Sequence, residues 1–326
     1  MNSLSKILFV FLFGLYYTLG HSQEDYKEYY SLLNQSKKTK DKDSSFYYLE
    51  KAIASTSAPF AEDVMELSMQ LFNQKQISKS KKAFLKAIAL GYEIDNDTVV
   101  NCIPYKIDYT PYVKNTSKSK EYMLEHYTNE IRKTRTTYLK NANSVDNQIF
   151  EAFLHNEHYF QDLRFLFYDN KVNDSLAFNY ISKYGATPSS YFMLDLLKKD
   201  KFPDRRKCVR FNGHTITMLL NHAIAGFLNK EDALAFVTLL WPLVENGKIT
   251  PREYAMAYDH YYQFYISEGK NYFGTVFILN DDNKLATMSL ADPKNVDAIR
   301  KKHYLIDLRT ECRSYKIELP ENYGKE

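Results

Sequence analysis

The spacing of apolar residues constrains the fold of this chain more than any other feature. Apolar side chains recur every three or four positions along most of the sequence, the spacing that places them on one face of a helix. Residues 24–95 contain four such stretches, and Gly91 follows the last of them at a position where helices commonly end. The spacing returns over residues 121–140 and 146–168. The sequence therefore predicts a mainly α-helical protein.

Two of the N-terminal stretches have similar sequences. Residues 49–54 read LEKAIA and residues 84–89 read FLKAIA, about 35 residues apart and close to the ~34-residue tetratricopeptide period. Residues 23–115 thus resemble a short tetratricopeptide-like array. The resemblance implies a groove that binds a protein partner. The alternative is a helical lid that stabilises the following domain.

The N-terminus has the layout of a secretory signal peptide. Lys6 precedes a mainly apolar run at residues 7–19, and small residues then lead to Gln23. The run is shorter than the roughly 20 apolar residues of a spanning helix. We expect residues 1–22 to be removed, which would leave no transmembrane segment and a periplasmic or secreted chain. A retained membrane anchor is the alternative.

Composition narrows the classes of function. The net charge of +3 and the pI of about 8.4 are too close to neutral for a nucleic-acid-binding protein, whose pI usually exceeds about 9. The basic run KKTKDK at residues 37–42 is interpreted as a solvated helix end or loop. Cys102, Cys208 and Cys312 form no CxxC pair. No metal or other cofactor is expected.

Prolines and polar residues between the helical stretches suggest the domain boundaries. Pro104, Pro111 and the polar run at residues 115–120 interrupt the helical spacing. Farther on, YFGTVFIL and LATMSL flank an Asn/Asp turn, which predicts a β-hairpin. The predicted organisation is a signal peptide at 1–22, a tetratricopeptide-like region at 23–115, a connecting helix at 116–145, and a C-terminal helical domain at 146–326 with its hairpin at 272–290.

The strongest local signal is the start of one helix at Thr250–Pro251. Thr250 suits the N-cap, Pro251 suits the first helical position, and Glu253 completes a capping box. The helix then carries Tyr254 and Asp259. Aspartate disfavours a helix interior, so Asp259 indicates either a specific contact or a solvated face.

A second polar candidate, His222, follows Leu219 and Leu220 on an apolar helix. It is interpreted either as a core histidine with a satisfied hydrogen bond or as a general base that titrates near neutral pH.

Short motifs in the C-terminal half resemble an uncharacterised bacterial domain family. The motifs are His222-Ala223, Gly247-x-Ile249-x-Pro251, Tyr254-Ala255, Asp259, Phe273-Gly274-Thr275, Asp292-Pro293 and Arg300. The resemblance covers roughly residues 146–316 and implies no reaction. This chain departs from the family at polar positions, with Asn221 in place of Gln, His260 in place of Arg, Phe273 in place of Tyr and Val276 in place of Gln.

These observations support three hypotheses. The leading one is an exported protein that binds a partner or ligand, with Thr275, Arg300 and Tyr254 as ligand-binding residues and an Asp259–Arg300 ion pair. The alternative is a hydrolase with His222 as general base and Asp259 as its acid or orienting group, although no nucleophile motif accompanies them. The third is a structural or interaction protein of the cell envelope.

Overall fold

The computed structural model forms two compact units. Unit 1 combines Met1–Ser57 with Val237–Glu326, and unit 2 is Ala58–Phe236. The residues that the structure describes are 26–92, 118–156, 183, 187–208, 213–225, 227–267, 269–279 and 285–324. This division differs from the predicted boundaries, because the first helix pair belongs with the C-terminal segment. The signal peptide prediction and Cys102 lie outside the described residues.

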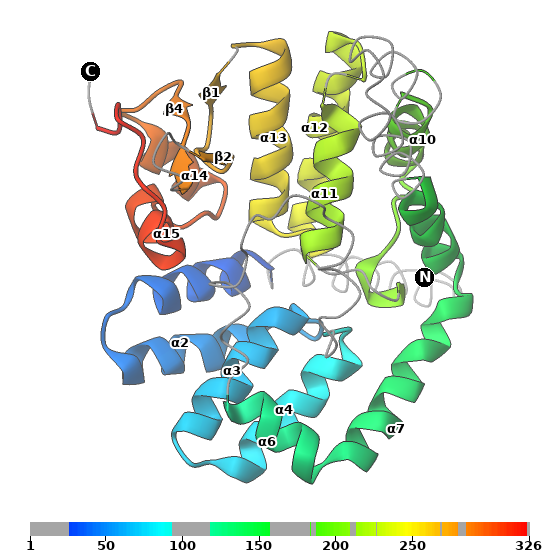
Figure 1. Cartoon of the computed structure of the whole chain (residues 1–326), viewed down its shortest axis with the longest axis vertical. Helices are drawn as coiled ribbons and strands as arrows, with labels where there is room; N and C mark the ends of the chain where they lie inside the picture. The colour runs from blue at the N-terminus through cyan, green and yellow to red at the C-terminus, as the bar shows by residue number, and fades with distance from the viewer. Residues whose placement is uncertain are drawn as a thin grey trace, which may run out of the picture. The chain divides into compact units, whose positions relative to one another are not determined.

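The predicted mainly α-helical class, with helical hairpins and a small β-hairpin, is confirmed (Figure 1). Unit 1 contains a helix at residues 26–38, α2 (Lys42–Ser55), the end of α12 (Lys230–Glu245), α13 (Pro251–Tyr265), β1 (Lys270–Asn271), β2 (Phe277–Leu279), β3 (Leu285–Thr287), β4 (Ser289–Leu290), α14 (Val296–Lys302) and α15 (Leu308–Tyr315). Unit 2 contains α3 (Ala61–Asn73), α4 (Ile77–Ala89), α6 (Lys118–His126), α7 (Thr128–Tyr138), a helix at 145–156, α10 (Thr187–Lys198), α11 (Gly213–Ile224), the start of α12, and 3₁₀ turns at Leu139–Asn143 and Arg205–Lys207.

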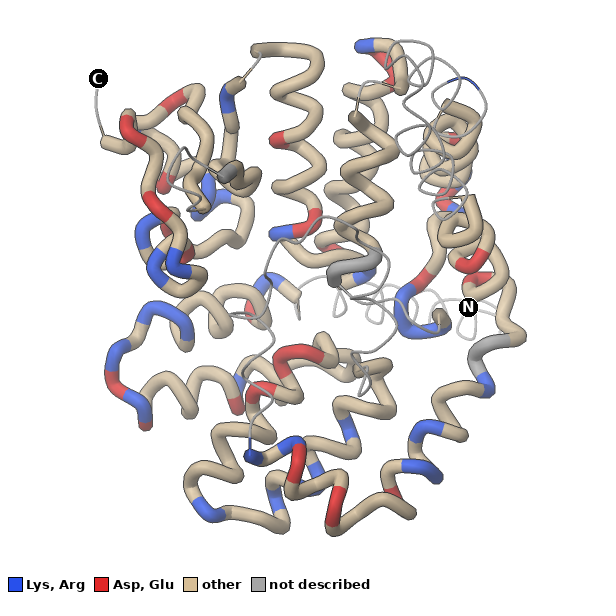
Figure 2. The backbone as a smooth tube through the Cα atoms, in the orientation of Figure 1, with Lys and Arg blue, Asp and Glu red and all other residues tan. Residues whose placement is uncertain are grey.

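Basic and acidic residues occur throughout both units (Figure 2). In the described part of the chain, no helix combines the length and the apolar character that crossing a membrane would require.

The strands of unit 1 form two small sheets. β2 pairs antiparallel with β3, with Phe277 opposite Thr287, and this is the predicted hairpin. It is shorter than the predicted span of 272–290, because the residues between β1 and β2 form a turn instead of a strand. β1 pairs in parallel with β4.

The first helix, at residues 26–38, packs on the C-terminal segment of unit 1 through one face. The Tyr30 hydroxyl donates to the carbonyl oxygen of Val244 at 2.9 Å. Asn34 donates its side-chain N–H to the carbonyl oxygen of Tyr304 at 2.8 Å. Because Tyr30 and Asn34 are four residues apart, they lie on the same side of the helix. The N-terminal helix is therefore an integral part of unit 1.

Gly247, after the end of α12, provides a test of this packing. Its φ is +65°, and an added Cβ would lie 2.0 Å from Cζ of Tyr26. We expect Gly247→Ala to lower the free energy of unfolding by about 2–5 kcal/mol, because left-handed strain of about 1–2 kcal/mol adds to overpacking of about 1–3 kcal/mol. Urea denaturation measures the change.

Gly269 is the matched control for that substitution. Its φ is +72°, and nothing lies within 4 Å of the position of an added Cβ. Gly269→Ala should therefore show only the backbone strain, about 1–2 kcal/mol. Equal losses in the two variants would contradict the packing of Tyr26 on Gly247.

Two serines exchange hydrogen bonds in each N-terminal helix pair, the helix at 26–38 with α2 and α3 with α4. The Ser36 hydroxyl donates to the carbonyl of Ser45 at 2.8 Å, and the Ser45 hydroxyl donates to the carbonyl of Ser36 at 2.9 Å. Ser68 and Ser80 make the same exchange at 2.9 and 2.8 Å. Like the LEKAIA and FLKAIA segments, Ser45 and Ser80 are about 35 residues apart, near the ~34-residue repeat period. The two helix pairs thus share a packing contact. The tetratricopeptide resemblance itself stays a prediction.

One predicted helix start is wrong. The Asp292-Pro293 pair predicts a helix from residue 293, but α14 begins at Val296 after the N-cap Asn295. The carboxylate of Asp292 instead accepts the backbone N–H of Asn295 at 3.1 Å. The contact resembles that of an N-cap, but residues 293–295 form a turn, and the helix begins only at Val296.

Candidate functional site

The capping box at the start of α13 fixes the position of the central polar residue. Thr250 Oγ1 accepts the N–H of Glu253 at 3.1 Å, and the Glu253 carboxylate accepts the N–H of Thr250 at 2.6 Å, as the sequence predicts. Pro251 occupies the first helical position. These contacts set where α13 begins, and so they set which residue of this helix faces the following turn.

That residue is Asp259, which is fully buried. Its Oδ1 accepts the backbone N–H groups of Tyr272 and Phe273, both at 2.6 Å. Its Oδ2 accepts the N–H of Thr275 at 2.7 Å and the Thr275 hydroxyl at 2.6 Å. Gly274 has φ +77° and lets the chain reverse between these donors. One carboxylate thus holds the whole turn.

The environment of Asp259 suits a structural role. Burial raises the pKa of Asp259, and the four hydrogen bonds to Phe273, Thr275 and Tyr272 oppose that rise. An ionised carboxylate only accepts hydrogen bonds, and four donors surround its two oxygens. The carboxylate has no exposed surface through which it could meet a substrate.

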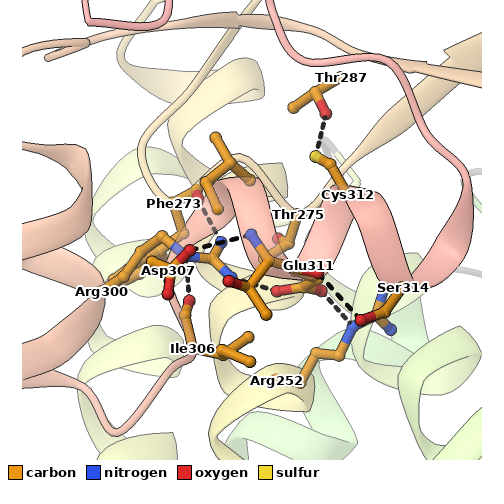
Figure 3. Close-up of polar contacts among 12 residues, drawn as sticks. Arg252, Phe273, Thr275, Thr287, Arg300, Ile306, Asp307, Glu311, Cys312 and Ser314 are labelled. Carbon is orange, nitrogen blue, oxygen red and sulfur yellow. Dashed lines mark hydrogen bonds and ion pairs between the residues drawn. The ribbon is translucent and has the colours of Figure 1, made fainter. Parts of the chain in front are cut away.

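Arg300 holds the same turn from α14. Its side chain is fully buried. Nη1 donates to the carbonyl of Phe273 at 2.7 Å, and Nε donates to the carbonyl of Ile306 at 2.7 Å. Nη2 bonds the carboxylate of Glu311 on α15 (Figure 3). Arg300 therefore links the turn to both C-terminal helices.

Glu311 joins Arg300 to a second arginine. Its other carboxylate oxygen accepts from Nε of Arg252, in the first turn of α13, at 2.8 Å. Burial alone would raise the pKa of Glu311, but the guanidinium groups of Arg300 and Arg252 outweigh burial and hold that pKa below its ordinary value. Arg252, Glu311 and Arg300 thus form a chain of alternating charge that ties α13, α14 and α15 together.

The predicted Asp259–Arg300 ion pair is wrong. Among the described residues, the partners of Asp259 are donors of the turn, and the charged partner of Arg300 is Glu311. Both side chains bind Phe273, Asp259 through its N–H and Arg300 through its carbonyl. Glu311 was missed because nothing in its local sequence distinguishes it from a solvated helix residue.

The predicted ligand-binding residues are mostly enclosed by the fold. Thr275 and Arg300 have no exposed surface. Tyr254 retains 6%, and burial raises the pKa of its hydroxyl. The Tyr254 ring packs edge-on against Trp241 at 5.1 Å and near-parallel to the His303 imidazole at 6.0 Å.

The two members of the predicted acid/base pair lie in different units. His222 is half-buried on α11 of unit 2, whereas Asp259 is sealed in unit 1. Asp259 uses both of its oxygens inside the turn. A hydrolase built on His222 would therefore need another residue in the role predicted for Asp259.

The buried turn at 272–275 positions a group of tyrosines that the sequence did not indicate as a site. Tyr258 and Tyr262 lie one turn apart on α13, and Tyr272 packs on both, with ring centroids 5.0 and 5.7 Å away. All three are half-buried. We call Tyr258, Tyr262 and Tyr272 the tyrosine face. The four-residue spacing on α13 was the available signal, but the contribution of Tyr272 was not visible in the sequence.

The two described cysteines have the properties of core residues. Cys208 and Cys312 are buried and form no disulfide. Burial raises the pKa of both thiols, which disfavours the nucleophilic thiolate. Within the described ranges, no three His, Cys, Asp or Glu side chains come together in a group that could hold a metal ion.

Three comparisons with known proteins gave no match to this chain: none with a family model, none with a curated protein and none with a solved structure. The resemblance to a bacterial domain family therefore stays a prediction.

Proposed function

We propose that this protein is an exported binding protein of the cell envelope and that its protein partner contacts the tyrosine face of unit 1. One observation carries the proposal. The polar motif residues Asp259 and Arg300 make their hydrogen bonds inside the fold. These bonds fix a turn whose first residue is the half-buried Tyr272.

The chemistry of the tyrosine face supports a binding role. Tyrosine combines a large apolar ring with a polar hydroxyl and loses little conformational entropy on binding, so it is enriched in protein interfaces. Tyr272 is also pre-positioned, because its backbone N–H is anchored to Asp259 at 2.6 Å. A fixed aromatic surface lowers the cost of association. Ile266, just after α13, adds a 46% exposed apolar side chain.

The N-terminal helix pairs offer a second possible surface for a partner. In the first pair, the helix at residues 26–38 uses Tyr30 and Asn34 to pack within unit 1. A partner that binds this helix pair would therefore contact exposed residues such as Tyr47 of α2, which is 50% exposed.

Alanine substitution on the tyrosine face tests the proposal. We expect Tyr262→Ala and Tyr272→Ala each to weaken capture of a specific partner from envelope extract, with a loss of about tenfold or more in affinity once that partner is purified. Central interface tyrosines commonly contribute about 2 kcal/mol or more. Tyr262→Phe should retain most of the binding, because it keeps the ring.

Tyr191→Ala is the matched control, since Tyr191 of α10 in unit 2 is 39% exposed. Equal loss of binding in the control, or full binding by both tyrosine-face variants, would refute the proposal. Point variants are preferable to a fragment such as residues 120–326, because that fragment lacks the helix at 26–38 that packs in unit 1.

A further inference from the structure

Positive charge is concentrated in two segments of unit 1. Residues 37–43 and 300–316 together contain ten Lys or Arg and four Asp or Glu, a net charge of +6, whereas the whole chain carries +3. The rest of the chain is therefore net negative. This asymmetry is not apparent from the nearly neutral overall composition.

The structure brings these two segments together. Lys38, in the first segment, forms an ion pair of 3.4 Å with Asp307, in the second. Asn34, one turn before Lys38, binds the carbonyl of Tyr304 at 2.8 Å. Figure 2 shows the basic positions of both segments along one side of unit 1. Residues about 270 positions apart in the sequence thus add their charge to one surface.

Four lysines of this surface are available to a partner. They are Lys40, Lys42, Lys301 and Lys302, which are exposed and form no ion pair with another described residue. We call these four residues the basic surface. Of the four acids in the two segments, Asp307 pairs with Lys38 and Glu311 is buried with two arginines, whereas Asp41 and Asp43 are exposed. The ten basic residues of these segments outnumber the four acids, so the surface keeps an excess of positive charge.

We propose that the basic surface docks this protein on a membrane that contains anionic phospholipid. Lys and Arg near such a membrane each strengthen binding by about 1 kcal/mol, which corresponds to roughly fivefold. Two exposed aromatic residues lie in or next to the two basic segments, Tyr47 on α2 at 50% and Tyr315 on α15 at 39% exposure. Tyrosine favours the boundary between headgroups and acyl chains, which favours a lipid surface over nucleic acid. This inference does not depend on the proposed partner of the tyrosine face.

Vesicle partitioning tests the proposal. The probes are vesicles of phosphatidylglycerol mixed with phosphatidylcholine, and vesicles of phosphatidylcholine alone. We expect the unaltered chain to prefer the anionic vesicles. Substitution of all four lysines of the basic surface by glutamine should reduce that preference more than tenfold, and 0.5 M salt should do the same. Comparing the two lipids cancels any contribution of the apolar residues 7–19, which every variant shares.

A second glutamine variant separates location from total charge. Lys79, Lys82, Lys86 and Lys133 are four exposed lysines of unit 2. Their replacement lowers the net charge of the chain by the same amount and should leave the preference nearly unchanged. The proposal is overturned if the two variants lose binding equally, if neither loses binding, or if the chain binds a short DNA duplex but not anionic vesicles. Fluorescence of Trp241, the only tryptophan, verifies that unit 1 is folded in each variant.

Discussion

Replacing Arg300 with methionine should lower the free energy of unfolding of unit 1 by about 3–5 kcal/mol, the usual cost of removing one member of a buried ion pair. The guanidinium group is fully buried and bonds two carbonyl groups and the Glu311 carboxylate. The substitution leaves these acceptors without their donor. Denaturant titration followed by the fluorescence of Trp241 measures the loss within unit 1.

Two further variants test whether this loss arises from the buried network. Arg313→Met removes an exposed arginine of α15 and should change stability by less than about 0.5 kcal/mol. Arg300→Met combined with Glu311→Leu should cost less than the sum of the two single losses, because the two side chains bond each other and each single loss already includes that contact. A loss below about 1 kcal/mol for Arg300→Met would contradict the assigned role.

The Glu311 carboxylate also gives this stabilisation a pH dependence. Its pKa in the folded chain lies below the ordinary 4.5, because the effect of Arg300 and Arg252 exceeds that of burial. A carboxylate with a depressed pKa contributes stability that is fully present above its unfolded pKa and is lost as the pH falls through the folded pKa. The stability difference between the unaltered chain and Glu311→Gln should therefore shrink below pH 4.5.

Replacing Asp259 with alanine should have a comparably large effect, about 3–6 kcal/mol. The carboxylate accepts three backbone N–H groups, from Tyr272, Phe273 and Thr275, and also the Thr275 hydroxyl. Each buried donor left unsatisfied costs about 1–3 kcal/mol. The same titration monitored by Trp241 fluorescence measures the change.

The free energy of unfolding of Asp259→Asn should lie between that of Asp259→Ala and that of the unaltered chain. The amide keeps one oxygen acceptor but turns an NH₂ group toward donors. Asp43→Ala is the control, because Asp43 is exposed on α2 in the same unit as Trp241. It should cost less than about 1 kcal/mol. If Asp259→Ala costs no more than this control, the turn does not depend on the carboxylate.

The features that the sequence predicted well depend on neighbouring residues. Apolar spacing predicted the helices because burial of one face requires a period near 3.6 residues. Thr250, Pro251 and Glu253 predicted the start of α13 because a capping box needs only backbone and side chains within one turn. The hairpin was predicted in the same way, from strand-forming residues on either side of a turn.

The sequence by itself therefore determined that this chain is helical, where α13 begins, and that Asp259 is unusual within it. Only the tertiary structure decided what Asp259 and Arg300 do, because their partners are the turn at 272–275 and Glu311, which packing brings together. Only the tertiary structure placed the helix at 26–38 with the C-terminal segment. Periodicity and capping are local, whereas the choice of an ion-pair partner or of a packing neighbour depends on long-range contacts that no short stretch of sequence encodes.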